Sequence, residues 1–226
     1  MNNRLSVGGI VSLTTVDFPG YLASVIFLQG CPWRCVYCHN PGLQEIFPGE
    51  SLPWEDIVNL LKARQGFLEG VVFSGGEPLI QEALPEAISE IKELEYKIGL
   101  HTSGALPKRL AAVLPLLDWV GLDIKQRFQN YHLITNIPGS GETASESLKL
   151  ALASGVDLEV RTTMHESITK EDAVKLSEEL AQMGVKKFVL QKCRDKDENI
   201  VEHPLFSDKI LLETLSNYFD SFYVRG

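Results

Sequence analysis

Three of the four cysteines lie together in the stretch GCPWRCVYCHNP, as Cys31, Cys35 and Cys38. A disulfide framework uses cysteines in pairs, and a closed zinc site takes four ligands. Three thiolates on one short loop can instead bind three irons of a cubane iron–sulfur cluster and leave the fourth iron open to a substrate. The alternative is a zinc knot whose fourth ligand is His39 or Cys193.

A glycine-rich turn follows the next apolar run, in the sequence VVFSGGEP. Gly75 and Gly76 carry no side chain, so the backbone there can approach a ligand closely. Glu77 and Pro78 complete the turn, and the proline fixes its exit. A Gly-Gly turn by itself is more typical of an ordinary loop. Its position after the cysteine stretch, at the end of a predicted strand, favours a ligand site and weakens the zinc alternative.

Apolar runs alternate with amphipathic runs along the chain, and this pattern predicts the elements that position these residues. Strands are predicted at 23–30, 70–76, 96–104, 118–125, 157–163 and 186–192. Helices are predicted at 53–65, 82–94, 107–117, 143–155, 169–184 and 207–218. The alternation indicates an α/β fold with a parallel sheet. Because a full eightfold barrel takes about 250 residues, we predict a partial (β/α)6 TIM-like barrel, with an open doubly wound sheet as the alternative.

Polar residues gather at the carboxyl ends of five consecutive predicted strands, which in barrels form the functional rim. The third, fourth and fifth strands end in HTSG, LDIK and EVRTT. One such residue alone is more typical of a helix cap or a surface ion pair. Together with the cysteine loop and the glycine turn, these strand ends predict one site. The residues that they add to it are Thr102, Ser103, Asp123, Lys125 and Arg161.

The length and composition predict one globular domain over residues 1–226. In this division 1–21 lead into the first strand, 22–195 form the barrel core, and 196–226 add a C-terminal helix and strand. A formal charge of -9 with scattered basic residues argues against a nucleic-acid partner. The sequence contains neither an apolar run long enough to span a membrane nor a recognisable secretory signal, so we expect a cytoplasmic protein.

The spacing C-x3-C-x2-C after the first strand, followed by GGEP after the second, resembles the radical S-adenosylmethionine (radical SAM) superfamily. The resemblance implies a radical SAM core fold and a 4Fe-4S cluster held by Cys31, Cys35 and Cys38. It also implies that the amino and carboxylate groups of S-adenosyl-L-methionine bind the open iron.

By the same resemblance, residues at the strand ends surround this cofactor. Tyr37 would lie near the adenine, and the GGEP turn would hydrogen-bond the methionine ammonium through its backbone. Thr102 and Ser103 would offer hydroxyl groups. The residues expected to face the methionine and the ribose are Asp123, Lys125 and Arg161.

His101 departs from the family pattern, in which this position usually carries an acid. In some members that acid helps to bind a monovalent cation beside the cofactor, so cation binding is an open question for this chain. The sequence leaves His101 as either a polar contact or a core histidine. The polar connection at 129–142 is longer than usual, and we predict that it takes part in partner contact.

Four motifs narrow the resemblance to a subgroup: GGIVSLTTVDFPG, CHNP, LDIK and EVRTT. They resemble the small activating enzymes of glycyl radical enzymes, with the activating protein of anaerobic ribonucleoside-triphosphate reductase as the nearest group. The similarity runs from about residue 5 to about residue 195. It implies reductive cleavage of S-adenosyl-L-methionine to a 5'-deoxyadenosyl radical, which generates a glycyl radical on a partner enzyme. It also implies an external one-electron reductant such as flavodoxin or ferredoxin.

Two other functions stay open from the sequence. The first is a small-molecule radical SAM enzyme, such as a 7-carboxy-7-deazaguanine synthase, which the VDFPG segment disfavours. The second is a protein without catalytic activity, either an iron–sulfur electron carrier or a zinc-stabilised binding module. The second reading needs a fourth protein ligand and has no use for GGEP.

Overall fold

The computed structural model describes residues 5–195, 197 and 199–226, so residues 1–4, 196 and 198 of the predicted terminal segments lie outside it. The strands of the described residues form one nine-stranded sheet. They are β1 (Val7–Thr14), β2 (Ala23–Leu28), β3 (Gly70–Gly75), β4 (Lys97–Thr102), β5 (Trp119–Asp123), β6 (Asp157–Met164), β7 (Lys187–Arg194), β8 (Ile200–Val201) and β9 (Ser221–Arg225).

Strands β2 to β7 are parallel and follow one another across the sheet in chain order. The predicted α/β fold and its six parallel strands are thereby confirmed. A doubly wound sheet reverses its strand order part-way, whereas this order is that of a barrel wall. Within the described residues β1, at one edge, pairs with neither β8 nor β9, which both join β7 at the other edge, and the barrel is open on that side.

Two parts of the sheet go beyond the prediction, which gave a C-terminal strand without its pairing and no strand before residue 22. Strand β1 pairs antiparallel with β2, although its residues were expected only to lead into the first strand. Strand β9 pairs in parallel with β7 and extends the barrel wall. Two adjacent glycines, Gly8 and Gly9, weaken the strand pattern of β1, because glycine is depleted in strands.

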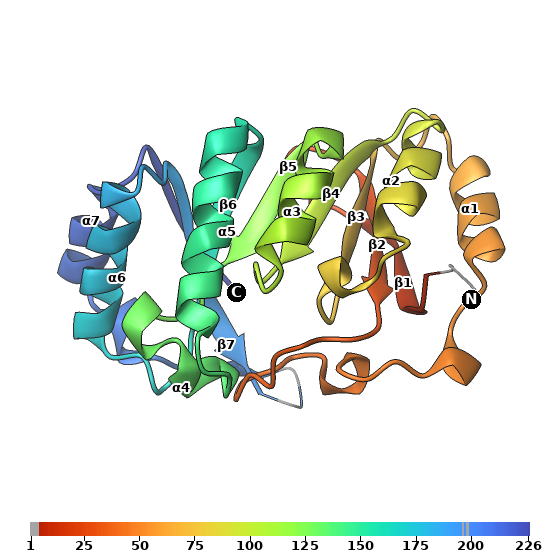
Figure 1. Cartoon of the computed structure of the whole chain (residues 1–226). Coiled ribbons are helices and arrows are strands. Elements are labelled where there is room, and N and C mark those ends of the chain that lie inside the picture. The colour runs from red at the N-terminus through yellow and green to blue at the C-terminus, as the bar shows by residue number, and fades with distance from the viewer. Residues whose placement is uncertain (1–4, 196, 198) are drawn as a thin grey trace.

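The helices lie along one side of the sheet, as Figure 1 shows for α1, α2, α3, α5 and α6. Helix α6 begins with a capping box, in which Thr169 and Asp172 each bind the other's backbone N–H. Helix α5 ends at Gly155 in the left-handed conformation that favours glycine. The helices are α1 (Trp54–Lys62), α2 (Leu84–Lys92), α3 (Pro107–Val113), α4 (His132–Thr135), α5 (Ser140–Ser154), α6 (Lys170–Gln182) and α7 (Lys209–Ser216).

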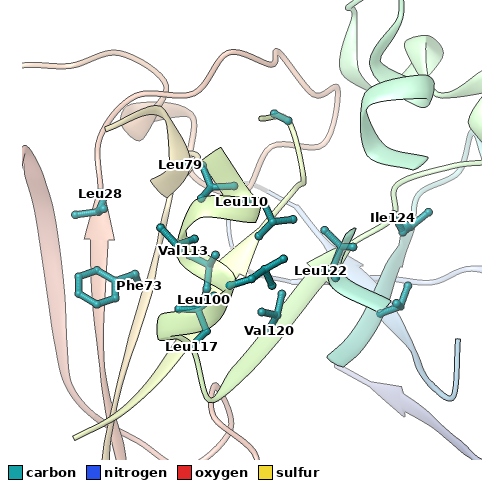
Figure 2. Packing of buried hydrophobic residues seen from close by; sticks show 14 of the residues in the cluster. Leu28, Phe73, Leu79, Leu100, Leu110, Val113, Leu117, Val120, Leu122 and Ile124 are labelled. Carbon is teal, nitrogen blue, oxygen red and sulfur yellow. The ribbon is translucent and has the colours of Figure 1, made fainter. Parts of the chain in front are cut away.

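The main core lies between the sheet and these helices (Figure 2). Alternate residues of each strand point toward the helices, among them Leu28, Phe73, Leu100 and Val120, and all four are fully buried. Burying one such side chain contributes roughly 1.5–3 kcal/mol, so this layer holds the helices on the sheet. Within the described residues, none of the helices combines the length and the apolar character needed to cross a membrane.

A smaller apolar cluster fills the barrel interior at the end opposite the polar strand ends. Its centre is Phe18, from the turn between β1 and β2, which stacks on Trp119 with ring centroids 5.6 Å apart. Gly70 leaves the room for this ring, since a Cβ there would lie 2.7 Å from Phe18 Cδ1. One end of the barrel is therefore closed by packing, and polar chemistry is left to the other end.

Candidate active site

A cavity of about 630 Å³ lies at the carboxyl ends of the parallel strands. It gathers the predicted site residues, except for Glu77 and Pro78, which do not line it. His101 and His39 also face it. Five loops that are far apart in the sequence therefore meet at one place, as the barrel interpretation predicted. The predicted residues that line the cavity are Cys31, Cys35, Tyr37, Cys38, Gly75, Gly76, Thr102, Ser103, Asp123, Lys125 and Arg161.

Residues 129–142, which were predicted to contact a partner, support the cysteine loop. The backbone N–H groups of Arg34 and Val36 donate to the carbonyls of Thr135 and Ile134, each over 3.0 Å. Ile134 is fully buried. Residues 129–142 thus contain α4 and the start of α5, and part of this connection is a buttress for the loop.

The two glycines of the GGEP turn are required by the chain's own backbone. Gly75 has φ +123, and a Cβ there would lie 2.2 Å from the carbonyl oxygen of Leu28. A Cβ on Gly76 would lie 2.3 Å from the carbonyl oxygen of Gly30. The turn therefore packs directly against the start of the cysteine loop. We expected room for a ligand, and the close approach seen here is to that loop.

Glu77 joins the GGEP turn to the end of β4. Its fully buried carboxylate accepts hydrogen bonds from Thr102 Oγ1 (2.7 Å), Ser103 Oγ (2.5 Å), Ser103 N (2.8 Å) and Leu79 N (3.2 Å). Burial raises the pKa of Glu77, and these four donors oppose that rise. The hydroxyls of Thr102 and Ser103 donate their protons to Glu77, so toward a cofactor these oxygens can act only as acceptors.

Asp123, Lys125 and Arg161 form one ionic group at the ends of β5 and β6. Arg161 Nε lies 2.9 Å from Asp123 Oδ1, and Lys125 Nζ lies 3.4 Å from Asp123 Oδ2. Burial raises the pKa of Asp123, but the two cations outweigh it and lower the pKa to about 2. Sheet register creates the pair, because Asp123 and Arg161 are directly aligned in neighbouring strands. The ionic group carries a net positive charge toward the cavity.

His101 is hydrogen-bonded at both ring nitrogens. Nε2 lies 2.9 Å from the carbonyl oxygen of Asp17, and Nδ1 lies 3.4 Å from Ser74 Oγ. Its ring meets the ring of Trp119 edge-on, with centroids 5.4 Å apart. Burial, with a contribution from the nearby Arg161 charge, lowers the pKa of His101 to about 3, so the ring is neutral at ordinary pH.

Arg225 lines the cavity from β9 and was not among the predicted site residues. Its guanidinium binds both carboxylate oxygens of Glu159, at 3.0 and 3.1 Å. Glu159 lies in β6 and is buried. No local motif marks Arg225, because only the pairing of β9 with β7 brings it to the site.

Residues 25–180 match the sequence profile of the Radical SAM superfamily. The chain belongs to the radical SAM superfamily. The matched residues include the cysteine loop, the GGEP turn and the Asp123–Lys125–Arg161 group, so the radical SAM match covers most of the predicted site.

Two curated relatives show to which family within the radical SAM superfamily the chain belongs. A putative glycyl-radical enzyme activating enzyme of Methanocaldococcus jannaschii is 31% identical over 175 residues, which cover 74% of this chain and 72% of the relative. A pyruvate formate-lyase-activating enzyme of Clostridium pasteurianum is 33% identical over 183 residues, covering 76% and 74%. The chain is thus an enzyme of the glycyl radical enzyme activase family, and a protein without catalytic activity is no longer the alternative.

Solved radical SAM structures share the fold at low sequence identity. Streptococcus suis SuiB bound to its precursor peptide SuiA superposes with a TM-score of 0.72 at 15% identity, covering 89% of this chain and 48% of SuiB. This chain therefore spans about half the length of SuiB. A domain of a pyruvate-formate lyase-activating enzyme from Bacteroides vulgatus gives 0.55 at 17% identity, covering 70% and 99%. SuiB has also been solved with S-adenosylmethionine.

Radical SAM enzymes use a 4Fe-4S cluster and S-adenosyl-L-methionine, and the three cysteines fit such a cluster. Burial raises the pKa of Cys31 to about 11 and also raises that of Cys35, so both thiols are protonated until metal displaces the protons. Among the described residues, no three His, Cys, Asp or Glu side chains are close enough to hold a single metal ion. A cubane cluster places each thiolate on a different iron, whereas a zinc knot converges its donors on one ion.

Tyr37 fits a bound cofactor for a different reason. Within the part of the chain that the structure describes, its hydroxyl is buried without a hydrogen-bond partner. Its ring stacks on His165, with centroids 5.4 Å apart, and Lys125 Nζ lies 5.8 Å from the ring centroid. A buried hydroxyl without a partner is costly, so a polar group of a cofactor in the cavity would stabilise it. The sequence analysis did not identify His165 as a neighbour of this ring.

Proposed function

We propose that this chain activates an anaerobic ribonucleoside-triphosphate reductase by generating a glycyl radical on it. The four motifs that resemble the reductase-activating group support the choice of reductase. One structural observation supports a protein substrate: the cavity is lined on one side by the cysteine loop and on another by residues that follow β1 and end β9. Val16 and Asp17 follow β1, and Arg225 and Gly226 end the chain at β9. The cavity therefore extends to the open side of the barrel, where a protein segment has access.

The cluster and S-adenosyl-L-methionine supply the radical chemistry: one electron splits the sulfonium bond to the adenosyl carbon, and the adenosyl radical removes a hydrogen atom from the partner's glycine. In our proposal Cys31, Cys35 and Cys38 hold three of the four irons. Lys125 and Arg161 bind carboxylate or ribose oxygens, since both are cations at the cavity wall. Asp123 keeps these two cations in place through the pairs described above.

The remaining parts of the proposal concern the surroundings of the reaction. A small external carrier such as flavodoxin or ferredoxin delivers the electron. The described cysteines are free thiols, which suits a reducing cytoplasm. The net charge of -9 supports a protein rather than a nucleic acid as the macromolecular partner.

The proposal is tested by anaerobic reconstitution with iron and sulfide, followed by electron paramagnetic resonance of the reduced protein with and without S-adenosyl-L-methionine. We expect a perturbed cluster signal and the release of 5'-deoxyadenosine. The reductase and the pyruvate formate-lyase of the same genome are then added separately, and a glycyl radical signal is expected on the reductase. A signal on the formate-lyase alone would assign the other partner. Adenosyl product without a radical on either protein would favour the small-molecule alternative.

A further inference from the structure

The segment at residues 14–20, here called the mouth turn, joins β1 to β2 at the edge of the open side of the barrel, and its residues Val16 and Asp17 line the cavity. Val16 is 64% exposed, although it lines the cavity together with Asp17. Thr14 Oγ1 donates to Asp17 Oδ2 over 2.6 Å, which closes the turn on itself. Phe18 is buried in the barrel interior and anchors the turn from below. The middle of the turn is therefore both exposed and part of the cavity wall, and it depends on further contacts for its position.

His101 supplies such a contact, from a strand on the other side of β3. The carbonyl oxygen of Asp17 can only accept, so the hydrogen bond requires a proton on Nε2 of the imidazole. The unprotonated Nδ1 then faces the hydroxyl of Ser74, which can donate to it. Packing against Trp119 fixes the ring plane. The low pKa described above is consistent with this single, neutral tautomer.

We propose that His101 is a positioning residue, whose Nε2–H holds the Asp17 carbonyl and so fixes the mouth turn where the glycine-bearing segment of the partner enters the cavity. The inference rests on the proposed function, because it assumes a protein substrate. At the other edge of the open side, toward the carboxyl ends of the strands, Arg225 is held by Glu159. The segment therefore enters between two walls that are fixed by different contacts, His101 on one side and Glu159 on the other.

Two substitutions separate the hydrogen bond from the ring. His101→Phe keeps an aromatic ring beside Trp119 and removes the donor, whereas His101→Gln keeps an amide N–H. His132→Phe is the matched control for the exchange readout alone, because His132 is exposed on α4 and does not line the cavity. The first readout is hydrogen–deuterium exchange of the peptide that covers the mouth turn. We expect faster exchange there in His101→Phe, values near wild type in His101→Gln, and no change in His132→Phe.

The second readout is the rate of glycyl radical formation as a function of reductase concentration. We expect His101→Phe to raise the KM for the reductase about tenfold, the equivalent of one lost hydrogen bond, with a much smaller change in kcat. His101→Gln should recover most of this loss. A uniform destabilisation would instead lower the active fraction, and with it kcat, while KM stayed the same.

Three results would overturn the inference. Unchanged exchange of the mouth turn in His101→Phe would show that the histidine does not hold it. An unchanged KM for the reductase in His101→Phe, with unchanged hydrogen–deuterium exchange outside the mouth turn, would show that His101 does not affect how the partner enters the cavity. A raised KM for S-adenosyl-L-methionine alone would make His101 a cofactor contact instead. If the wild-type protein forms no glycyl radical on the reductase, the proposed function fails, and the exchange experiment still decides whether His101 positions the turn.

Discussion

The carboxylate of Glu77 accepts both the hydroxyl and the backbone N–H of Ser103, at 2.5 and 2.8 Å. These bonds tie the turn after β3 to the end of β4, and they occupy a residue that belongs to a motif expected to bind the cofactor. Part of the GGEP motif thus shapes the cavity without lining it. The Gly-Gly pair packs on the cysteine loop, and the acid clamps the neighbouring strand.

Glu77→Gln is expected to destabilise the fold by about 2 kcal/mol, because an amide nitrogen cannot accept the hydrogen bonds that the carboxylate oxygen accepted. Urea unfolding of the apoprotein measures the free energy of unfolding. Glu82→Gln is the matched control, since the side chain of Glu82 is 79% exposed in its ion pair with Arg109. Equal effects of the two substitutions would contradict the clamp.

Gly76→Ala is expected to reduce cluster assembly. The added Cβ would meet the carbonyl oxygen of Gly30 at 2.3 Å, and the cysteine loop begins with Cys31, directly after Gly30. Relief of this clash must move the loop, because the carbonyl oxygen of Gly30 belongs to the backbone and not to a flexible side chain. Iron and sulfide content after reconstitution should fall well below the wild-type value. Gly42→Ala, where a Cβ would find open space, should leave the iron content unchanged.

Serine substitutions are expected to separate the four cysteines into two classes. Cys31→Ser, Cys35→Ser and Cys38→Ser should each abolish stable cluster binding, because each removes the thiolate ligand of one iron. Cys193→Ser should retain the cluster, since Cys193 is a buried residue of β7 that does not line the cavity in the described structure. Cluster binding is measured by the visible absorbance of the iron–sulfur cluster and by iron analysis. Loss of iron in Cys193→Ser would make Cys193 a fourth ligand of the cluster and contradict the open iron.

His101 is expected to make stability depend on pH below its ordinary pKa. The folded-state pKa is about 3, below the unfolded value of 6.5, so the unfolded chain binds more protons between these two values. Stability contributed by the neutral ring is therefore present above pH 6.5 and is lost as the pH falls toward 3, at about 1.4 kcal/mol per pH unit. His101→Gln has no such proton. The free energy of unfolding of wild type relative to this variant should fall between pH 7 and pH 5.5, and a constant difference would contradict the assignment.

Local patterns were sufficient for the parallel strands and most helices. Apolar runs such as VVFSGG mark strands that are buried on both faces, and the helices between them force parallel pairing. Strand β1 escaped detection because it is an antiparallel strand at the edge of the sheet, where several residues, including Val11 and Leu13, are exposed. The C-terminal strand was predicted, but a short final run gives no sign that β9 joins β7.

The sequence by itself determined the chemistry of this protein. Each of the two motifs consists of residues that are close along the chain: Cys31, Cys35 and Cys38 in one, and GGEP in the other. Covalent connectivity therefore already keeps the groups within each motif close together. Only the tertiary structure decided that Glu77 binds Ser103, that Asp123 aligns with Arg161, and that Arg225 and the mouth turn border the opening. These relationships depend on strand register and on packing between distant segments, which no local pattern of residues specifies.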